Sequence, residues 1–111
     1  MVLRDLGNPG EARPLAERAL AIAEATYSPD HPTVAFQLSV LAGVLRHLGD
    51  PGGARPLAEW ALAISEATYS PDHTIVAARL NNLSMVLQTL GDAAGERILA
   101  ERAAASRQPR E

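Results

Sequence analysis

The sequence contains no cysteine and no lysine, and each absence excludes a class of chemistry. Without cysteine the chain can form no disulfide bond, no thiolate nucleophile and no thiolate metal site. All ten of its Lys+Arg residues are arginines, so a Schiff-base intermediate and a lysine-containing phosphate loop are excluded too. A Gly-x-Ser-x-Gly nucleophile motif is also absent. The sequence therefore predicts a protein that is not an enzyme and uses no cofactor.

Excess basic charge and long apolar runs are missing as well. The formal net charge of -3 argues against nucleic acid as a partner. No apolar run approaches the ~18 residues of a membrane-spanning helix, and Arg4 and Asp5 come too early for a signal peptide. These features predict a cytoplasmic protein without a membrane partner. Frequent Ala, Arg, Gly and Pro residues indicate GC-rich coding, which favours a bacterial origin.

Aromatic residues are scarce, and this limits how a core can be filled. They make up 4% of the chain, whereas hydrophobic residues as a group make up 47%. Ala and Leu must therefore do most of the packing, which is the composition of helices that approach one another closely. A length of 111 residues suits one domain and is too short for two independent cores.

A short motif recurs along the chain and organises it. Residues 48–59 read Leu-Gly-Asp-Pro-Gly-Gly-Ala-Arg-Pro-Leu-Ala-Glu, residues 6–17 repeat them with few changes, and residues 90–101 repeat them more weakly. When residues 6–47 are aligned with 48–89, about two-thirds of the positions are identical. The chain is therefore predicted to be a repeat array in which each copy of the motif marks a turn between helices.

Capping signals predict where helices begin. Asn8 and Asp50 each precede a proline, the arrangement of an N-cap followed by proline at the first helical position. Asp30 and Asp72 follow the Ser-Pro dipeptides and are predicted to cap the next helices.

Glycine and a partial repeat predict where helices end and how the chain opens. Gly49 and Gly91 suit the left-handed residue that follows a helix. Residues 1–6 match residues 85–90, so they are predicted to be the end of a truncated helix. Full helices are then predicted near 9–27, 31–48, 51–69, 73–90 and 93–107.

Apolar residues at spacings of three and four predict one buried stripe on each helix. In the second and fourth helices the stripe is Val34, Leu38, Leu41, Leu45 and Leu48, and Val76, Leu80, Leu83, Leu87 and Leu90. In the first and third helices it is Ala12, Leu15, Ala19 and Ile22, and Ala54, Leu57, Ala61 and Ile64. Short connections make neighbouring helices antiparallel, so the predicted fold class is all-α, a right-handed solenoid of helix hairpins.

These features together resemble the tetratricopeptide repeat family, in the 42-residue form found in kinesin light chains and many bacterial proteins. The resemblance rests on Leu80-Asn81-Asn82-Leu83-Ser84, Leu90-Gly91-Asp92, Ala61-Leu62-Ala63-Ile64 and the linker Pro29-Asp30-His31-Pro32-Thr33-Val34-Ala35. A HEAT-like array of similar period is the second choice, because the Gly-Asp turn and the small-residue helices fit it less well. The chain departs from the family at Leu45 and Leu87, where a tyrosine is common.

The resemblance implies how the single domain, residues 1–111, is divided. Residues 1–27 would be a partial repeat, 31–69 a complete one, and 73–107 a degenerate terminal one. Because stable arrays usually need about three units, the chain is expected to be either a fragment of a longer protein or a remnant from one.

The resemblance also implies an interaction module whose first helices line a concave groove for a peptide or a partner's helix. The predicted groove residues are Phe36, Ser39, Gly43, Arg46, His47, Ala78, Asn81, Met85, Gln88 and Thr89. Arg46 could hold a carboxylate, while Asn81 and Gln88 could pair with a peptide backbone. The alternative is that these residues form an ordinary solvated helix face.

Three other residues invite a specific role. Trp60 stands where the other copies have Arg18 and Arg102, so it is predicted to be an exposed surface anchor, or else a ring lying flat on a neighbouring helix. His31 and His73 lie at matching linker positions, but neither has a second ligand at helical spacing. Structural packing is therefore expected for both, with no metal site.

Two further functions stay open besides partner binding as part of a larger scaffold or signalling protein. The face around Ala12, Ala16 and Ala19 is only partly covered by the predicted stub, so two chains could form a homodimer there. Repeats of this kind also serve as sensor arms of bacterial NTPase regulators, in which an additional domain supplies the chemistry.

Overall fold

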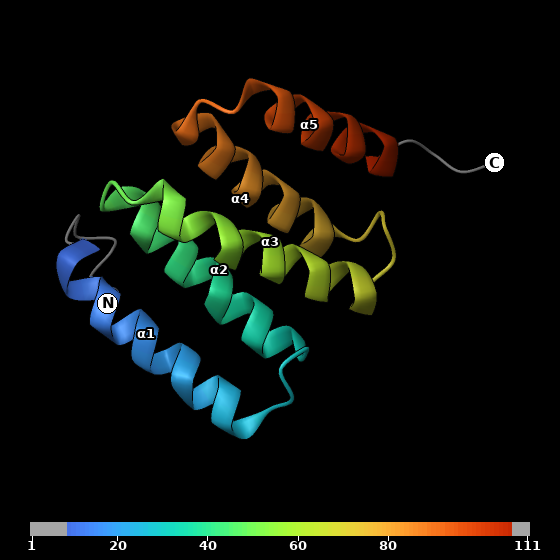
Figure 1. Cartoon of the computed structure of the whole chain (residues 1–111). Helices are drawn as coiled ribbons and strands as arrows, with labels where there is room; N and C mark the ends of the chain where they lie inside the picture. The colour runs from blue at the N-terminus through green and yellow to red at the C-terminus, as the bar shows by residue number, and fades with distance from the viewer. Residues whose placement is uncertain (1–8, 108–111) are drawn as a thin grey trace.

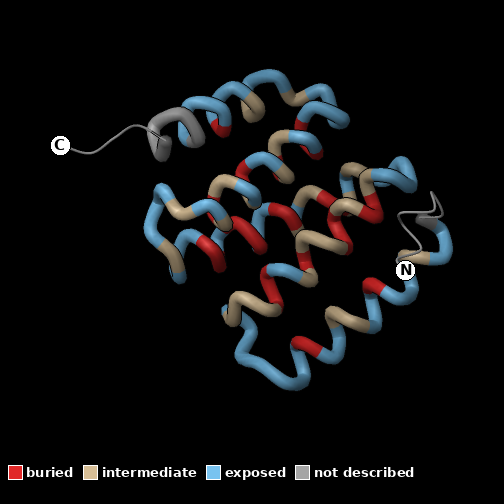
Figure 2. Tube along the Cα trace, turned by 180° about the vertical axis from the view of Figure 1, so that it is seen from behind, coloured by how far each residue is buried: buried red, intermediate tan, exposed pale blue. Residues whose placement is uncertain are grey.

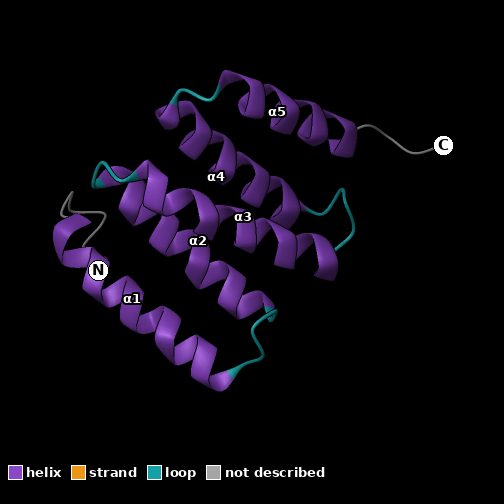
Figure 3. Ribbon diagram, in the orientation of Figure 1, coloured by secondary structure: helices purple, strands orange, loops and turns teal. Residues whose placement is uncertain are grey.

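The computed structural model describes residues 9–107, and this range folds into five helices joined by short turns (Figures 1 and 3). The helices are α1 (Pro9–Thr26), α2 (Pro32–His47), α3 (Pro51–Thr68), α4 (Thr74–Leu90) and α5 (Ala93–Arg107). The predicted all-α fold and its five full helices are confirmed, with ends within one residue of the predicted ones. The predicted truncated helix at 1–6 and the cap at Asn8 lie outside the described residues.

The turns after α2 and α4 are built as the repeated motif predicts. Gly49 and Gly91 adopt left-handed conformations, with φ of 84° and 75°. Residues that have a Cβ atom rarely adopt this conformation. At the start of α3 the Asp50 carboxylate then accepts a hydrogen bond from the Gly53 amide at 2.9 Å. The chain therefore reverses direction within three residues, which brings α2 against α3.

The predicted caps of α2 and α4 are wrong, because histidines occupy the cap positions. The His31 and His73 rings accept hydrogen bonds through Nδ1 from the backbone amides of Thr33 and Ile75, at 3.0 and 3.1 Å. The His31 amide donates to the Ser28 carbonyl and closes a tight turn. Asp30 is consequently inside the turn, one residue before the cap.

The tyrosines of the linkers support these histidine caps. Tyr27 stacks on His31 and Tyr69 stacks on His73, with ring centroids 4.3 and 4.4 Å apart. The two linkers thus have the same structure: the tyrosine ring orients the histidine ring, and the histidine caps the next helix. This accounts for both histidines as structural residues, as the sequence predicts.

The helices stack in chain order, and the core runs between them (Figures 1 and 2). Each helix contacts the next in sequence, and α2 also contacts α4 directly. Leu38, Ala42, Ala54 and Ala61 have no exposed surface. Alanine therefore fills part of the core, as its high share of the composition predicts.

The predicted buried stripe is confirmed in α3 and wrong in α1. The stripes predicted for the second and fourth helices are wrong at their last residues, Leu48 and Leu90, which are exposed at the turns. Ile64 is buried among residues of α2, but its equivalent Ile22 is 57% exposed, and Leu15 is 55% exposed. The stripe of α3 packs against α2, the helix that precedes it. For α1 no preceding helix is present among the described residues, so the same stripe faces solvent.

Candidate functional site

The exposed sides of α2 and α4 form one surface, which we call the α2–α4 face. The Asn82 side-chain amide donates to the Ser39 carbonyl oxygen at 3.4 Å, and the Arg79 guanidinium carbon lies 5.9 Å from the centre of the Phe36 ring. Both contacts join residues that differ by 43 in number. The two helices therefore run parallel, and a residue of α2 meets the residue 43 positions later in α4.

All ten predicted groove residues lie on this face, and none is buried. Phe36 is 53% exposed and Met85 is also an exposed large hydrophobic residue. Ser39, Gly43 and Arg46 are half-buried, whereas His47, Ala78, Asn81, Gln88 and Thr89 are exposed. The face therefore offers apolar and polar groups side by side.

Two of these side chains are partly engaged within their own helices. His47 Nδ1 lies 2.8 Å from the Gly43 carbonyl oxygen, and the Thr89 hydroxyl donates to the Met85 carbonyl oxygen at 2.9 Å. Such bonds to the carbonyl four residues earlier hold the side chains along the helix. His47 and Thr89 are thus less available to a ligand than Arg46 or Asn81.

Buried polar atoms without a partner gather on the same pair of helices. Among the described residues, the atoms of this kind are Ser39 Oγ, Arg46 Nε and Arg79 Nε, all on α2 or α4. In folded proteins most buried polar groups make a hydrogen bond, so an unpaired one requires an explanation. Here the three atoms lie beneath the α2–α4 face, covered by the protein itself.

Arg79 is a site residue that the sequence reasoning missed. It is half-buried beside Phe36, and burial lowers the pKa of its guanidinium while the nearby Tyr69 phenol acts in the opposite direction. An arginine remains charged at neutral pH nonetheless. The sequence prediction included Ala78 because it is the residue of the second repeat that corresponds to Phe36. It did not include the neighbouring Arg79.

A small pocket opens next to Arg79. Its volume is about 270 Å³, and it is lined by Pro32, Thr33, Phe36, Ser65, Tyr69, Ile75 and Arg79. The lining is mainly apolar, with the guanidinium as the only charged group. The pocket can therefore take an apolar side chain that lies next to an anionic one.

The helices of the α2–α4 face carry no acidic residue. The segments 32–47 and 74–90 contain Arg46 and Arg79 but no Asp or Glu, although the chain has 13 acidic residues and a net charge of -3. The acidic residues lie on the other helices, in the linkers and near the ends of the chain. The two charged side chains of α2 and α4 are thus both cationic, although the protein as a whole is acidic.

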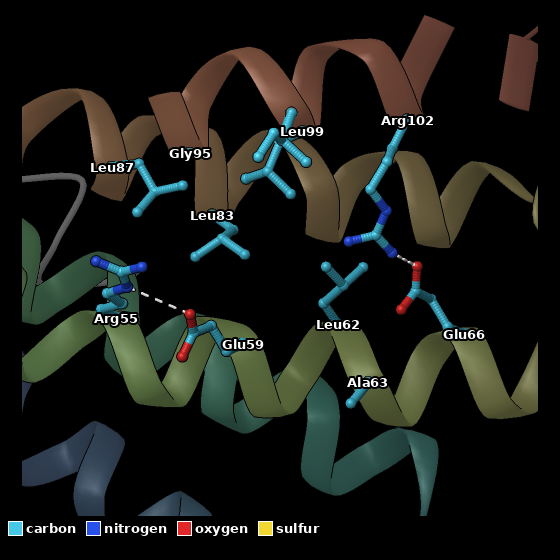
Figure 4. A pocket seen from close by; sticks show the side chains of 11 residues that line it. Arg55, Glu59, Leu62, Ala63, Glu66, Leu83, Leu87, Gly95, Leu99 and Arg102 are labelled. Atoms are coloured by element: carbon cyan, nitrogen blue, oxygen red, sulfur yellow. Dashed lines mark hydrogen bonds and ion pairs between the residues drawn. The ribbon is translucent and has the colours of Figure 1, made fainter. Parts of the chain in front are cut away.

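A second pocket, of about 360 Å³, lies between α3 and α5 (Figure 4). Leu62, Leu83 and Leu99 form its apolar floor, and each of the three is buried. Arg55 pairs with Glu59 at 3.2 Å and Arg102 pairs with Glu66, so the charged groups of its rim are matched within the chain. The charged groups of this pocket are therefore less available to a ligand than those of the α2–α4 face.

The predicted exposure of Trp60 is confirmed. Its side chain is 43% exposed on α3, and Arg18 and Arg102 at the equivalent positions are exposed as well. The interface role predicted for it stays a prediction.

Neither a metal site nor a membrane span is found in the described part of the chain. Residues 9–107 contain no group of three or more His, Asp or Glu side chains placed to hold a metal ion. None of the five helices is both long and apolar enough to cross a bilayer.

Comparison with known proteins identifies the fold. The tetratricopeptide repeat model matches residues 1–67 and 38–108, which together cover most of the chain. The crystal structure of "kinesin light chain nearly identical TPR-like repeats" from Podosopora anserina superposes with a TM-score of 0.86 at 26% sequence identity. The match covers 92% of this chain and 48% of that one, so the chain spans about half the length of its structural relative. No curated protein matches the sequence. The HEAT-like alternative is not retained, and the chain belongs to the tetratricopeptide repeat family.

Proposed function

We propose that this protein is a noncatalytic module that binds an extended segment of a partner protein on the α2–α4 face. Tetratricopeptide repeats generally mediate protein–protein interactions and lack catalytic activity. The observation that carries the proposal is the surface on α2 and α4 in which the exposed apolar side chains of Phe36 and Met85 lie on the same pair of helices as the exposed amide of Asn81. Apolar side chains and amides side by side can pack against a peptide's side chains and bond its backbone.

The differences between the internal repeats support the same face. Between α2 and α4 only six positions are identical, and all six are buried in α2: Val34, Ala35, Leu38, Leu41, Val44 and Leu45. All five groove positions of α2 differ from those of α4. Over the same length α1 and α3 are almost identical, including exposed residues such as Glu17 and Glu59. Exposure alone therefore does not explain why the α2–α4 face has diverged, whereas a binding role does.

A selection from a random peptide library tests this proposal without assuming a partner. Peptides of about twelve residues selected against the protein should lose about tenfold in affinity when Phe36 or Asn81 is replaced by Ala. Both side chains are exposed, so unfolding by urea should stay unchanged. Arg18→Ala on α1 is the matched control. If Trp60→Ala weakens binding while the other variants do not, the site lies on α3 and the proposal is wrong.

A second candidate function, self-association, is favoured by the open stripe of α1. Leu15 and Ile22 are more than half exposed there, although Leu57 and Ile64, their equivalents in α3, are half-buried and buried. Two copies of α1 can cover these residues by packing against each other about a two-fold axis.

Light scattering tests self-association directly, because it gives the molar mass of the protein over about a hundredfold range of protein concentration. A dimer that forms as concentration rises, and that Leu15→Glu abolishes, is the expected result, because a buried unpaired carboxylate opposes the contact. A monomer at every concentration would eliminate this candidate and leave the α2–α4 face unaffected.

The division into units follows from the same proposal. We take the α2–α3 hairpin, residues 31–69, and the α4–α5 hairpin, residues 73–107, as the two complete repeats, with residues 1–27 as a partial one. Each complete unit then contributes its first helix to the binding face. In this view the module belongs to a larger scaffold or signalling protein.

A further inference from the structure

We infer that the protein forms a two-fold dimer in which Trp60 of each copy enters the pocket between α3 and α5 of the other. The contact uses the outward side of α3, which is separate from the α2–α4 face and from the open stripe of α1. Three observations carry the inference: an exposed ring and an apolar pocket on two sides of one helix, an uncharged line between them, and rim charges that are already paired.

Trp60 and the pocket lie on different sides of α3. The pocket is on the side facing α5, where Arg102 of α5 reaches back to Glu66 of α3 (Figure 4). Trp60 has the position in α3 that Arg102 has in α5, so it points away from α5, towards α1. The helical spacing agrees, because Trp60 is about 100° further round α3 than Glu59, which lines the pocket. The helix therefore carries a projecting ring on one side and an opening on the other.

The ring and the opening also lie at the same height along α3. The residues of α3 that line the pocket run from Arg55 to Glu66, and Trp60 is close to the middle of this range. A two-fold rotation about an axis parallel to α3 exchanges the two sides of the helix and keeps every height. Two copies related in this way place each Trp60 over the pocket of the other, so one symmetry operation makes both contacts.

The pocket has the size and chemistry to receive the ring. Its volume is about 360 Å³, and Leu62, Leu83 and Leu99 form a buried apolar floor. Ile98 at its edge is 57% exposed, and Trp60 itself is 43% exposed. Insertion removes apolar surface of both side chains from water, and tryptophan is among the residues that contribute most to protein interfaces.

The outward line of α3 allows the two helices to meet. Gly52, Pro56 and Ala67 are exposed on this line, at spacings of four and eleven residues, and none of them has a long or charged side chain. The distance between packed helices depends on the side chains at the contact, so small residues let the axes approach. Trp60 projects further than its neighbours and can therefore cross to the other copy. The small residues permit the contact, whereas the ring and the pocket specify it.

Paired charges favour a second copy as the occupant. The charged residues of α3 are Arg55, Glu59 and Glu66. Arg55 lies 3.2 Å from Glu59 and 3.4 Å from Asp92, and Glu66 pairs with Arg102. A surface with unpaired charge of one sign repels a copy of itself, and burying an unpaired charge is unfavourable. Neither obstacle is present on this side of α3, so two identical surfaces can meet on it.

The single tryptophan makes the contact directly observable. Over about a hundredfold range of protein concentration, the molar mass from light scattering should rise from monomer to dimer. The emission maximum of Trp60 should move to shorter wavelength over the same range, because the ring leaves water. A monomer at every concentration would overturn the inference, as would a dimer whose formation leaves the emission unchanged.

Two variants remove the ring and the edge of the pocket separately. Trp60→Arg introduces the residue that α1 and α5 carry at this position, so the fold should tolerate it. Trp60→Arg and Ile98→Glu should each raise the dissociation constant of the dimer at least about tenfold without changing urea unfolding of the monomer. Ile22→Glu on α1 is the matched control, because Ile22 and Ile98 are both 57% exposed. A dimer lost with Ile22→Glu but kept with Trp60→Arg would assign self-association to α1 and overturn the inference.

Mixing the two variants tests the reciprocal geometry. A dimer of either variant alone lacks both ring-and-pocket contacts. A mixed dimer regains one of them, between the ring of the Ile98→Glu chain and the intact pocket of the Trp60→Arg chain. The mixture should therefore associate more tightly than either variant alone and recover part of the emission shift. No gain on mixing would contradict the insertion of Trp60. Either result leaves the peptide site on the α2–α4 face unaffected, since that site is measured separately.

Discussion

Replacing Leu38 by Ala is expected to lower the free energy of unfolding by about 3 kcal/mol. Leu38 lies in α2 with no exposed surface, among Ala23, Val34 and Ala61 of three different helices. Removing its side chain loses the transfer free energy of the buried atoms and leaves a cavity that helices already in close contact cannot fill. Since domains of this size are stable by about 5–15 kcal/mol, the loss is a large share of the total.

Leu15→Ala is the matched control for this substitution. The same atoms are removed from α1, but Leu15 is 55% exposed, so the change should stay within about 0.5 kcal/mol. Urea unfolding followed by circular dichroism measures both variants. Equal effects of the two substitutions would mean that α1 is covered in solution, in line with self-association, or that Leu38 is not central to the core.

Ala61→Leu is expected to destabilise the array by about 2 kcal/mol through overpacking. Ala61 is fully buried in α3 and lies in the same core cluster as Ala35 of α2, which is also fully buried. The small residues allow these helices to approach closely, so added methyl groups must push them apart. Thermal unfolding is the measurement, with Ala63→Leu as the control.

Ala63 is exposed in the same helix, and its replacement by Leu keeps helix propensity almost unchanged. The control should therefore unfold at nearly the same temperature as the unmodified protein. If Ala61→Leu behaves like the control, the close contact between α2 and α3 is not required for stability, and the packing account is wrong.

The fold could be predicted from the sequence because the repeat shows each signal more than once. Gly49 and Gly91 mark the same left-handed turn, and the apolar stripes of α2 and α4 agree position by position. These are local signals whose physical meaning does not depend on the rest of the chain. The helix boundaries followed from them directly.

The errors arose where a residue depends on its neighbours in space. Asp30 has the better cap chemistry, but the turn at Ser28 places His31 at the cap instead. Leu15 and Leu57 have the same local sequence, yet they differ in burial. Leu57 is in α3, which packs against the preceding helix α2, whereas no described helix precedes α1. Spacing within one helix could not reveal either outcome.

The candidate site was predictable in outline but not in its charge. Helical spacing placed all ten predicted residues on the α2–α4 face, because their positions repeat every three or four residues. Arg79 was missed because its role comes from Phe36 of the other helix, and this contact follows only from the parallel alignment of α2 and α4. The absence of acidic residues from both helices was a readable signal that would have drawn attention to it.

The most direct test of the central claim is to map where an unbiased, library-selected peptide binds on the isotope-labelled protein. Amide chemical shifts recorded during a titration report every helix at once. The account predicts that the largest changes fall on α2 and α4, around Phe36, Arg46 and Arg79, with little change along α3. Changes centred on the pocket between α3 and α5, or on the open stripe of α1, would contradict it.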